Sequence, residues 1–419
     1  MNASERASGR QHGHSSSVGR VRPDGASDIP ALDPYAPADL GPIRLRNRLI
    51  KAATFEGRTR DQVVTQQLID FHRAMAGGGV GLTTVAYCAV RNDGTTDGRQ
   101  LWWRDDVLPG MRRLTDAIHS EGAAISAQIG HSGPVADGKA IGAPTYAPSK
   151  SFNALSRRFN RAATEQDIAE IVEAFAKSAR MAEDSGFDCV ELHFGHNYFI
   201  SAFLSPRLNK RTDQWGGSLE NRARLARLVA KTVREATGGR IAVTAKLSMD
   251  DGVGGGLRPP EAIQVAQWLE QDGALDALEL TAGSSLLNPM YLFRGGAPIK
   301  EFAANFSPMM RVGLKAFGKN FIRAYPYTDL FLLETAKKFR AAVSMPLILL
   351  GGVTSHDTVM TAMAEGFDFV AMGRALLMEP DLPNRMRADH STTSACIHCN
   401  RCMPTIYSRT RCVLVEPDA

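Results

Sequence analysis

Long hydrophobic runs are absent from this chain of 419 residues. No stretch approaches the roughly 18 consecutive apolar residues of a transmembrane helix, so we expect no membrane span. The first residues, MNASERASGRQHGHSSSVGR, also lack the apolar core of a secretory signal, and we therefore expect a cytoplasmic protein. Residues 1–30 are polar and rich in Gly, Ser and Arg, which predicts a disordered tail.

Clusters of positive charge are scarce as well. The formal net charge is +5, and the 49 lysines and arginines are spread along the chain, with much of the excess in the tail and around residues 207–224. A nucleic-acid interface needs a basic patch or stripe, so we expect no nucleic-acid partner. A mildly basic site for a phosphate-bearing cofactor accounts for the charge equally well.

Short apolar runs alternate with helical patterns from Ile43 onward. Runs of this kind are typical of parallel strands that are buried on both faces. Eight runs and eight helical patterns predict a (β/α)8 barrel over residues 31–390. The expected strands are Leu49–Ala53, Gly81–Val85, Ala124–Ile129, Cys189–Leu192, Ile241–Leu247, Leu275–Leu280, Leu347–Leu350 and Phe369–Met372. The expected helices are Thr65–Ala76, Leu108–Ser120, Glu165–Asp184, Leu219–Ala236, Pro259–Gln271, Leu330–Phe339, Asp357–Glu365 and one that begins near Asp381.

A dinucleotide fingerprint is also missing. A doubly wound sheet, the alternative fold, requires a G-x-G-x-x-G turn after the first strand, and none follows Leu49–Ala53. The connection Ala282–Thr328, after the sixth expected strand, is long and rich in Met, Phe and Pro. Long connections in compact domains are usually functional, so we expect a lid over the site there.

The fourth expected strand runs into His193-Phe194-Gly195-His196-Asn197-Tyr198. In barrel enzymes the chemistry lies at the carboxyl ends of the strands. Two imidazoles can both donate to one carbonyl oxygen, and a phenol can donate a proton. The spacing alone leaves a surface histidine pair beside a core tyrosine equally open, and a zinc site would need an H-E-x-x-H context or a third ligand nearby.

Glycines follow the seventh and eighth expected strands, in Gly351-Gly352 and Gly373-Arg374. Glycine lets backbone N–H groups approach a phosphate, and Arg374 can chelate one through two N–H groups. Barrel phosphate sites are built from these two loops, so we predict a phosphate site rather than two simple turns.

Two polar side chains interrupt other apolar strands. Gln128 ends the third expected strand, where its amide can pair with the edge of a heterocycle. Lys246 lies in the fifth, where a lysine either stabilises negative charge on a reduced cofactor or snorkels to the surface.

Taken together, these residues resemble the old yellow enzyme family of FMN-dependent ene-reductases. The strongest match is the run Glu191–Tyr198, which continues through Phe203-Leu204-Ser205-Pro206 and the stretch NKRTDQWGGSLENR that begins at Asn209. The segments Arg46–Arg48 and Gln128–Gly133 and the two glycine loops also match, so the resemblance covers about residues 38–412.

The resemblance implies FMN as cofactor, NAD(P)H as reductant and a role for each residue. His193 and His196 would bind the electron-withdrawing group of the substrate, and Tyr198 would donate a proton. The flavin ring would be contacted by Ala53, Thr54, Gln128 and Lys246, and the phosphate by Gly351, Gly352, Gly373 and Arg374.

Three positions depart from the family pattern. Asn197 replaces the usual glycine, so we expect the backbone of that loop to differ. Lys246 replaces the usual arginine, which keeps the charge but loses the planar fork. Tyr87 replaces a small residue and is expected to form a wall of the substrate pocket, as in the amine-dehydrogenase branch.

Six cysteines are present. Cys88 and Cys189 lie in apolar runs and are expected to be buried core thiols. The segment 391–419 carries the other four in the pattern Cys396-x2-Cys399-x2-Cys402-x9-Cys412, which resembles the iron–sulfur segment of the dienoyl-CoA reductase and trimethylamine dehydrogenase branch. A [4Fe–4S] cluster, a zinc ion and a metal-free segment all remain open.

We therefore expect an FMN-dependent NAD(P)H oxidoreductase that reduces an activated C=C bond of an α,β-unsaturated carbonyl compound. One alternative is a dehydrogenase of an amine or alcohol that passes electrons through an iron–sulfur cluster, with Tyr87, Trp102 and Trp103 caging a cation. Another is a flavin-binding protein without turnover. The expected partner is a small-molecule substrate, while homo-oligomerisation and the choice between NADH and NADPH stay open.

Overall fold

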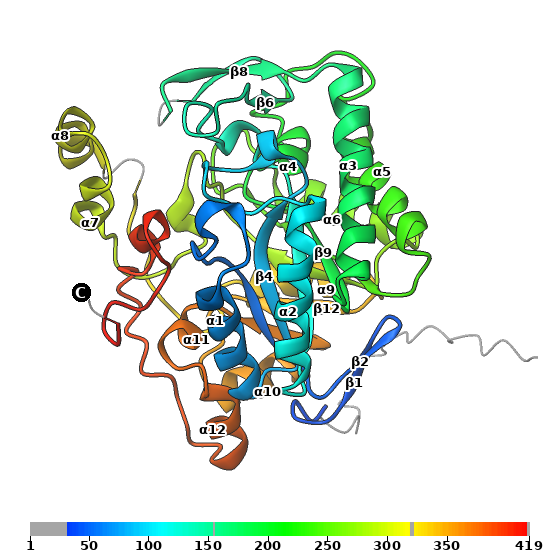
Figure 1. Cartoon of the computed structure of the whole chain (residues 1–419), viewed down its shortest axis with the longest axis vertical. Helices are drawn as coiled ribbons and strands as arrows, with labels where there is room; N and C mark the ends of the chain where they lie inside the picture. The colour runs from blue at the N-terminus through cyan, green and yellow to red at the C-terminus, as the bar shows by residue number, and fades with distance from the viewer. Residues whose placement is uncertain (1–31, 154–155, 319–321, 417–419) are drawn as a thin grey trace, which may run out of the picture. The chain divides into compact units, whose positions relative to one another are not determined.

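A computed structural model describes residues 32–153, 156–318 and 322–416 of the chain. Eight parallel strands close into a barrel in the order β10-β11-β12-β13-β3-β4-β5-β9 (Figure 1). All eight expected strands are present, so the predicted (β/α)8 barrel is confirmed, whereas the predicted tail lies outside the described residues. The barrel strands are β3 (Leu49–Phe55), β4 (Leu82–Ala89), β5 (Ala124–Gly130), β9 (Cys189–Phe194), β10 (Ala242–Ser248), β11 (Ala277–Thr281), β12 (Leu347–Leu350) and β13 (Phe369–Met372).

Helices alternate with these strands and cover the outside of the barrel (Figure 1). Local signals set their ends: Thr164 and Asp167 form a capping box at the start of α3, and Gly238 ends α5 with φ +56°. The expected helices are confirmed as α1 (Gln66–Gly77), α2 (Leu108–His119), α3 (Glu165–Asp184), α5 (Leu219–Thr237), α6 (Pro259–Gln271), α9 (Leu333–Arg340), α10 (His356–Ala364) and α12 (Leu382–Ala388).

Two layers of apolar side chains form the core. The larger layer lies between the barrel and its helices. The smaller one fills the amino end of the barrel, where Leu40 and Leu45 of the hairpin β1 (Ala38–Leu40) and β2 (Ile43–Leu45) pack on inward-facing strand residues. Cys88 and Cys189 are buried, as expected, with 2% and 0% of their surface exposed. The barrel is therefore closed at one end and open for a site only at the other.

Several elements around the carboxyl end of the barrel have no counterpart in the sequence prediction. A small sheet of β6 (Tyr146–Ala147), β7 (Ser151–Asn153) and β8 (Arg158–Ala162) precedes α3, and four short helices lie in connections that follow barrel strands. The long connection after β11 contains two of these additional helices and packs against the cysteine segment, through residues such as Phe302 and Met403 (Figure 1). The short helices are α4 (Phe199–Leu204), α7 (Ile299–Ala304), α8 (Pro308–Phe317) and α11 (Arg374–Met378).

Within the described part of the chain, no helix combines the length and the apolar character that crossing a bilayer requires.

Candidate active site

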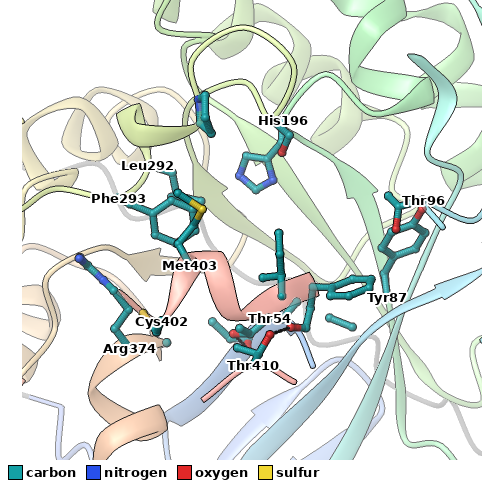
Figure 2. A pocket seen from close by; sticks show the side chains of 18 of the residues that line it. Thr54, Tyr87, Thr96, His196, Leu292, Phe293, Arg374, Cys402, Met403 and Thr410 are labelled. Atoms are coloured by element: carbon teal, nitrogen blue, oxygen red, sulfur yellow. Dashed lines mark hydrogen bonds between the residues drawn. The ribbon is translucent and has the colours of Figure 1, made fainter. Parts of the chain in front are cut away.

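A cavity of about 830 Å³ lies at the carboxyl ends of the barrel strands. Its volume falls within the roughly 300–1,000 Å³ that is typical of small-molecule sites. Figure 2 shows Arg374 and Cys402 on one side, Tyr87 and Thr96 on the other, and His196 above the space between. Every residue that the sequence predicted for the flavin and the substrate lines this one cavity: Ala53, Thr54, Tyr87, Gln128, His193, His196, Tyr198, Lys246, Gly351, Gly352, Gly373 and Arg374.

The two histidines and the tyrosine after β9 lie close together. The ring centroid of His193 is 5.3 Å from that of His196 and 4.5 Å from that of Tyr198. His193 belongs to β9 itself, which continues two residues beyond the predicted end, whereas the other two residues lie in the loop that leads to α4. The arrangement brings two imidazoles and a phenol to one side of the cavity.

Burial determines the protonation of these groups. It lowers the pKa of His196 to about 3, with Lys246 adding to the effect. Burial, His196 and Lys246 together lower the pKa of His193 as well. Burial raises the pKa of Tyr198 to about 12. At neutral pH the site therefore holds two neutral imidazoles, each with one N–H, and a protonated phenol.

The loop between β9 and α4 is held by neighbouring strands. The His196 backbone N–H donates to the Ser248 hydroxyl at 3.0 Å, and its Nε2 lies 2.9 Å from the Thr281 hydroxyl. His196 and Asn197 both adopt left-handed backbone conformations, with φ of +61° and +59°. Asparagine tolerates this region better than other residues with a Cβ, so the loop keeps a turn that glycine would also permit.

Tyr87 forms a wall of the cavity, and its hydroxyl is bonded to the backbone. The hydroxyl donates to the Gly94 carbonyl at 2.8 Å, while the ring meets Tyr198 edge-on with centroids 5.4 Å apart. The alternative of an aromatic cage does not hold for the two tryptophans, since neither Trp102 nor Trp103 is among the described residues that line the cavity. Arg104 stacks on Trp102, and Trp103 packs on Phe187.

Lys246 lies at the cavity with 2% of its surface exposed, so it does not snorkel to solvent. Its Nζ donates to Glu191 at 3.0 Å and to Glu279 at 2.6 Å, and Gln128 donates to the same Glu191 at 2.7 Å. Burial alone would lower the pKa of Lys246, but the two carboxylates outweigh it and raise that pKa. Burial raises the pKa of Glu279 to about 8 despite the lysine. At neutral pH Glu279 therefore holds a proton beside the ammonium of Lys246.

The glycines after β12 and β13 differ in backbone conformation and in the space around them. Gly351 and Gly352 have φ of +102° and +78°, and a Cβ on Gly352 would lie 2.5 Å from the Leu330 nitrogen. These two glycines are required by the turn itself. A Cβ on Gly373 would instead meet nothing within 4 Å, so this backbone borders open space. Beside it, Arg374 donates through Nη1 to the Arg294 carbonyl and to Asn400, and its side chain lines the cavity. An open backbone and a guanidinium at α11 fit the phosphate of FMN.

The four terminal cysteines line a second, much smaller cavity beside Arg374. Among the residues that the structure describes, no group of three or more His, Cys, Asp or Glu is placed to hold a single metal ion. Zinc needs four ligands around one ion, whereas each thiolate of a [4Fe–4S] cluster binds a different iron. The structure therefore brings the four cysteines around one space.

Other residues around the site were missed by the sequence analysis. Glu279 is an acid in an apolar strand, and the reasoning applied to Lys246 would have singled it out. The cysteine segment contributes Met403, Tyr407 and Thr410 to the cavity wall, and the long connection contributes Phe302. No local sequence pattern predicts these contacts, because they join segments that are distant in the sequence.

The closed parallel barrel, the cavity at its carboxyl end, the open Gly373-Arg374 loop and the histidine pair define a barrel oxidoreductase that binds a flavin nucleotide. Residues 34–282 match the model of the NADH:flavin oxidoreductase / NADH oxidase family. The chain belongs to this family, so it is an FMN-dependent NAD(P)H oxidoreductase, and the resemblance to old yellow enzyme is confirmed.

Named relatives span several reactions. The chain is 49% identical to the 4,4'-dithiodibutanoate disulfide reductase of Rhodococcus erythropolis, over 91% of this chain and 94% of that protein. It is 34% identical to a metal reductase of Desulforamulus reducens over 89% of this chain, but spans only 52% of that protein. The structure of the old yellow enzyme homologue from Zymomonas mobilis matches 88% of this chain and 96% of its own, with a TM-score of 0.69 and 23% identity, which supports the fold.

Proposed function

We propose that the protein uses NAD(P)H to reduce the activated C=C bond of a small α,β-unsaturated carbonyl compound. The observation that carries the proposal is the meeting of His193, His196 and Tyr198 at one cavity, with centroid distances of 4.5 and 5.3 Å. When bound, FMN supplies the hydride chemistry, accepting a hydride from NAD(P)H and delivering it to the acceptor. In sum, NAD(P)H, one proton and the unsaturated compound yield NAD(P)⁺ and the saturated compound.

The histidines bind the carbonyl oxygen of the acceptor. Both are neutral, so each offers one N–H to that oxygen. Negative charge accumulates on the oxygen when the β-carbon receives a hydride, and preorganised donors to such an oxygen are worth about 3 kcal/mol each. Tyr198 then protonates the α-carbon, since its raised pKa keeps the phenol proton in place. Solvent returns the proton to the tyrosine.

We further propose which residues hold FMN. Gly373 and Arg374, with the turn at Gly351-Gly352, bind the phosphate, supported by the open space at Gly373. The backbone around Ala53 and Thr54 and the polar groups of Gln128 and Lys246 contact the flavin ring, supported by their shared place in the cavity lining.

We also propose that Cys396, Cys399, Cys402 and Cys412 hold a [4Fe–4S] cluster. The support is their common place around one small cavity. Cys402 and Arg374 line both cavities, so the proposed cluster would lie beside the proposed flavin site.

Reduction of a small organic disulfide is a second candidate function. The relative at 49% identity, matched over 94% of its length, is named for that reaction. The electrons balance in the same way, because NAD(P)H and one proton convert a disulfide into two thiols. The histidine N–H groups would then face a departing thiolate. The amine-dehydrogenase alternative has less support, since Trp102 and Trp103 lie outside the described cavity lining.

Parallel anaerobic assays with NAD(P)H distinguish the two candidates. One assay contains cyclohexenone and the other contains 4,4'-dithiodibutanoate, with cyclohexanone and free thiol as the measured products. We expect cyclohexanone to form with NAD(P)H consumption in equal amount. If thiol forms without cyclohexanone, disulfide reduction replaces C=C reduction as the proposed function. If the protein binds FMN and forms neither product, a flavin-binding protein without turnover is favoured.

A further inference from the structure

We propose that Asp251 and Asn197 are positioning residues that hold His196 and Tyr198 at the cavity by tethering both ends of helix α4. The inference rests on the proposed function for the roles of His196 and Tyr198. It goes beyond that function because neither Asp251 nor Asn197 lines the cavity in the described part of the chain.

The first tether is formed by Asn197, which stands between His196 and Tyr198 in the sequence. The Asn197 amide donates through Nδ2 to Asp251 Oδ1 at 3.1 Å, and both residues are fully buried, with 0% of their surface exposed. Asn197 also holds a left-handed backbone conformation, with φ +59°. The turn sets the backbone conformation of Asn197, whereas the hydrogen bond to Asp251 sets the position of its side chain.

The second tether lies at the other end of the helix. Ser205, the residue that ends α4, donates its hydroxyl to Asp251 Oδ2 at 2.6 Å. The same oxygen accepts the Leu257 backbone N–H at 2.8 Å, which fixes the carboxylate within the loop between β10 and α6. One carboxylate thus holds the entry and the exit of α4 and is itself anchored to a neighbouring loop.

The helix requires such support. It has six residues, starts directly after Tyr198 and carries no side-chain cap at Tyr198. Helices shorter than about 12 residues are marginal in water without tertiary contacts. All six residues of α4 are buried, so tertiary contacts hold the helix, and Asp251 supplies one of these contacts at each end.

Hydrogen bonds, rather than a counter-ion, satisfy Asp251. Within the described residues the side chain forms no ion pair, and its three donors are Asn197, Ser205 and Leu257. Burial raises its pKa, and Asp250 is the nearby acid that adds to the effect. Burying an acid without a cation costs free energy, and the three hydrogen bonds that offset this cost also fix the position of the carboxylate.

A double-mutant cycle tests the proposal in the FMN-loaded enzyme. Asn197→Gly keeps the left-handed turn and removes only the amide tether. We expect it to slow the acceptor step roughly tenfold, the size of a typical coupling between contacting residues. In a Tyr198→Phe background the same change should slow that step less, because one of the two groups it positions is already missing. Equal slowing in both backgrounds, or no slowing in either, would overturn the proposal.

Ligand binding gives a second measurement that does not need turnover. A para-substituted phenol binds to the histidines and is followed by its long-wavelength absorbance with the flavin. We expect Asn197→Gly and Ser205→Ala to weaken phenol binding by about tenfold each, measured at a temperature where both variants remain folded. Unchanged phenol affinity in both variants would contradict the proposal. If the parent enzyme binds the phenol tightly but does not reduce cyclohexenone, the proposed function is contradicted. The positioning role can then still be measured through the phenol affinities of the variants.

Discussion

Tyr198 and the two histidines divide the work of the site by their protonation states. The pKa of Tyr198 is raised to about 12 by burial, whereas burial lowers that of His196 to about 3. In the proposed reaction the phenol is therefore the group that gives a proton across the neutral range, and the neutral imidazoles are the hydrogen-bond donors to the substrate. A site of this kind needs no charged acid to protonate carbon.

Replacing Tyr198 with phenylalanine tests this division. Tyr198→Phe should slow reduction of cyclohexenone by roughly 10²–10⁴-fold, since it removes a general acid. Flavin reduction by NAD(P)H should proceed at the parent rate, because that step needs no proton from the phenol. Stopped-flow absorbance of each half-reaction measures both. Tyr35→Phe, which removes a hydroxyl bonded to His356, serves as the matched control. An unchanged enone rate in Tyr198→Phe would mean that another group delivers the proton.

The buried Lys246–Glu191–Glu279 cluster predicts a specific pH dependence of stability. The pKa of Glu279 is raised to about 8 in the folded state, above its ordinary 4.5. Between these values the folded chain holds a proton that the unfolded chain has lost, so this group's contribution to stability falls as pH rises towards 8. Glu279→Gln keeps the shape and cannot ionise. Its thermal midpoint should therefore decline less than that of the parent between pH 5 and 8, and parallel curves would contradict a protonated Glu279.

Substitutions at Arg374 and at its neighbour Asn400 distinguish a role of Arg374 in phosphate binding from a role in local structure. Arg374→Ala should weaken FMN binding by roughly 10–100-fold, the range expected for losing a hydrogen bond to a charged group. Asn400→Ala is the control, because it removes the side chain that Arg374 contacts and keeps the guanidinium. Titration of apoprotein with FMN, followed by fluorescence quenching, measures both affinities. Equal losses in the two variants would assign Arg374 to structure rather than to phosphate binding.

At the scale of elements, the cysteine segment is part of the active-site architecture. Thr410 donates its backbone N–H to the Glu56 carbonyl, and Arg99 donates to the Tyr407 carbonyl at 2.8 Å. Phe302 of α7 packs against Tyr407, with ring centroids 6.0 Å apart. The segment therefore joins the end of β3 to the connection after β11 and supplies a wall of the cavity.

The metal content of this segment is directly measurable. Anaerobically prepared protein should contain about four irons and four acid-labile sulfides per chain, as a [4Fe–4S] cluster requires. Cys402→Ala should lose the iron, whereas Cys88→Ala, which removes a thiol from β4, should retain it. Iron analysis and the broad visible absorbance of the cluster provide the measurement. One zinc per chain, or metal-free protein, would contradict the proposed cluster.

At the scale of the whole molecule, FMN should stabilise the barrel. A ligand that binds only the folded state at 100 times its dissociation constant adds about 2.7 kcal/mol to the free energy of unfolding. The expected result is a higher thermal midpoint for apoprotein with FMN than for apoprotein alone. Riboflavin is the matched control because it lacks the phosphate, and it should give a smaller shift at the same concentration. Equal shifts would argue against the Gly373-Arg374 phosphate site.

The barrel was predictable because its signals are local. Each strand is a short apolar run, and helices such as α3 begin and end at residues that cap them. The extra helices α4, α7 and α11 escaped prediction because they are short and lie in connections without a regular apolar period. Tertiary contacts, rather than intrinsic propensity, stabilise helices of this length.

By itself, the sequence determined the barrel, the family and the identities of His193, His196, Tyr198 and the four clustered cysteines, since these depend on local periodicity and residue order. Only the tertiary structure decided that Glu191 and Glu279 both pair with Lys246, that Asp251 contacts both ends of α4, and that Trp102 and Trp103 are not among the described residues lining the cavity. These contacts join residues that are 33 to 55 positions apart, such as Lys246 with Glu279 and with Glu191. Strand neighbours and loop contacts of that separation follow from the closure and register of the barrel, which no local pattern in the chain encodes.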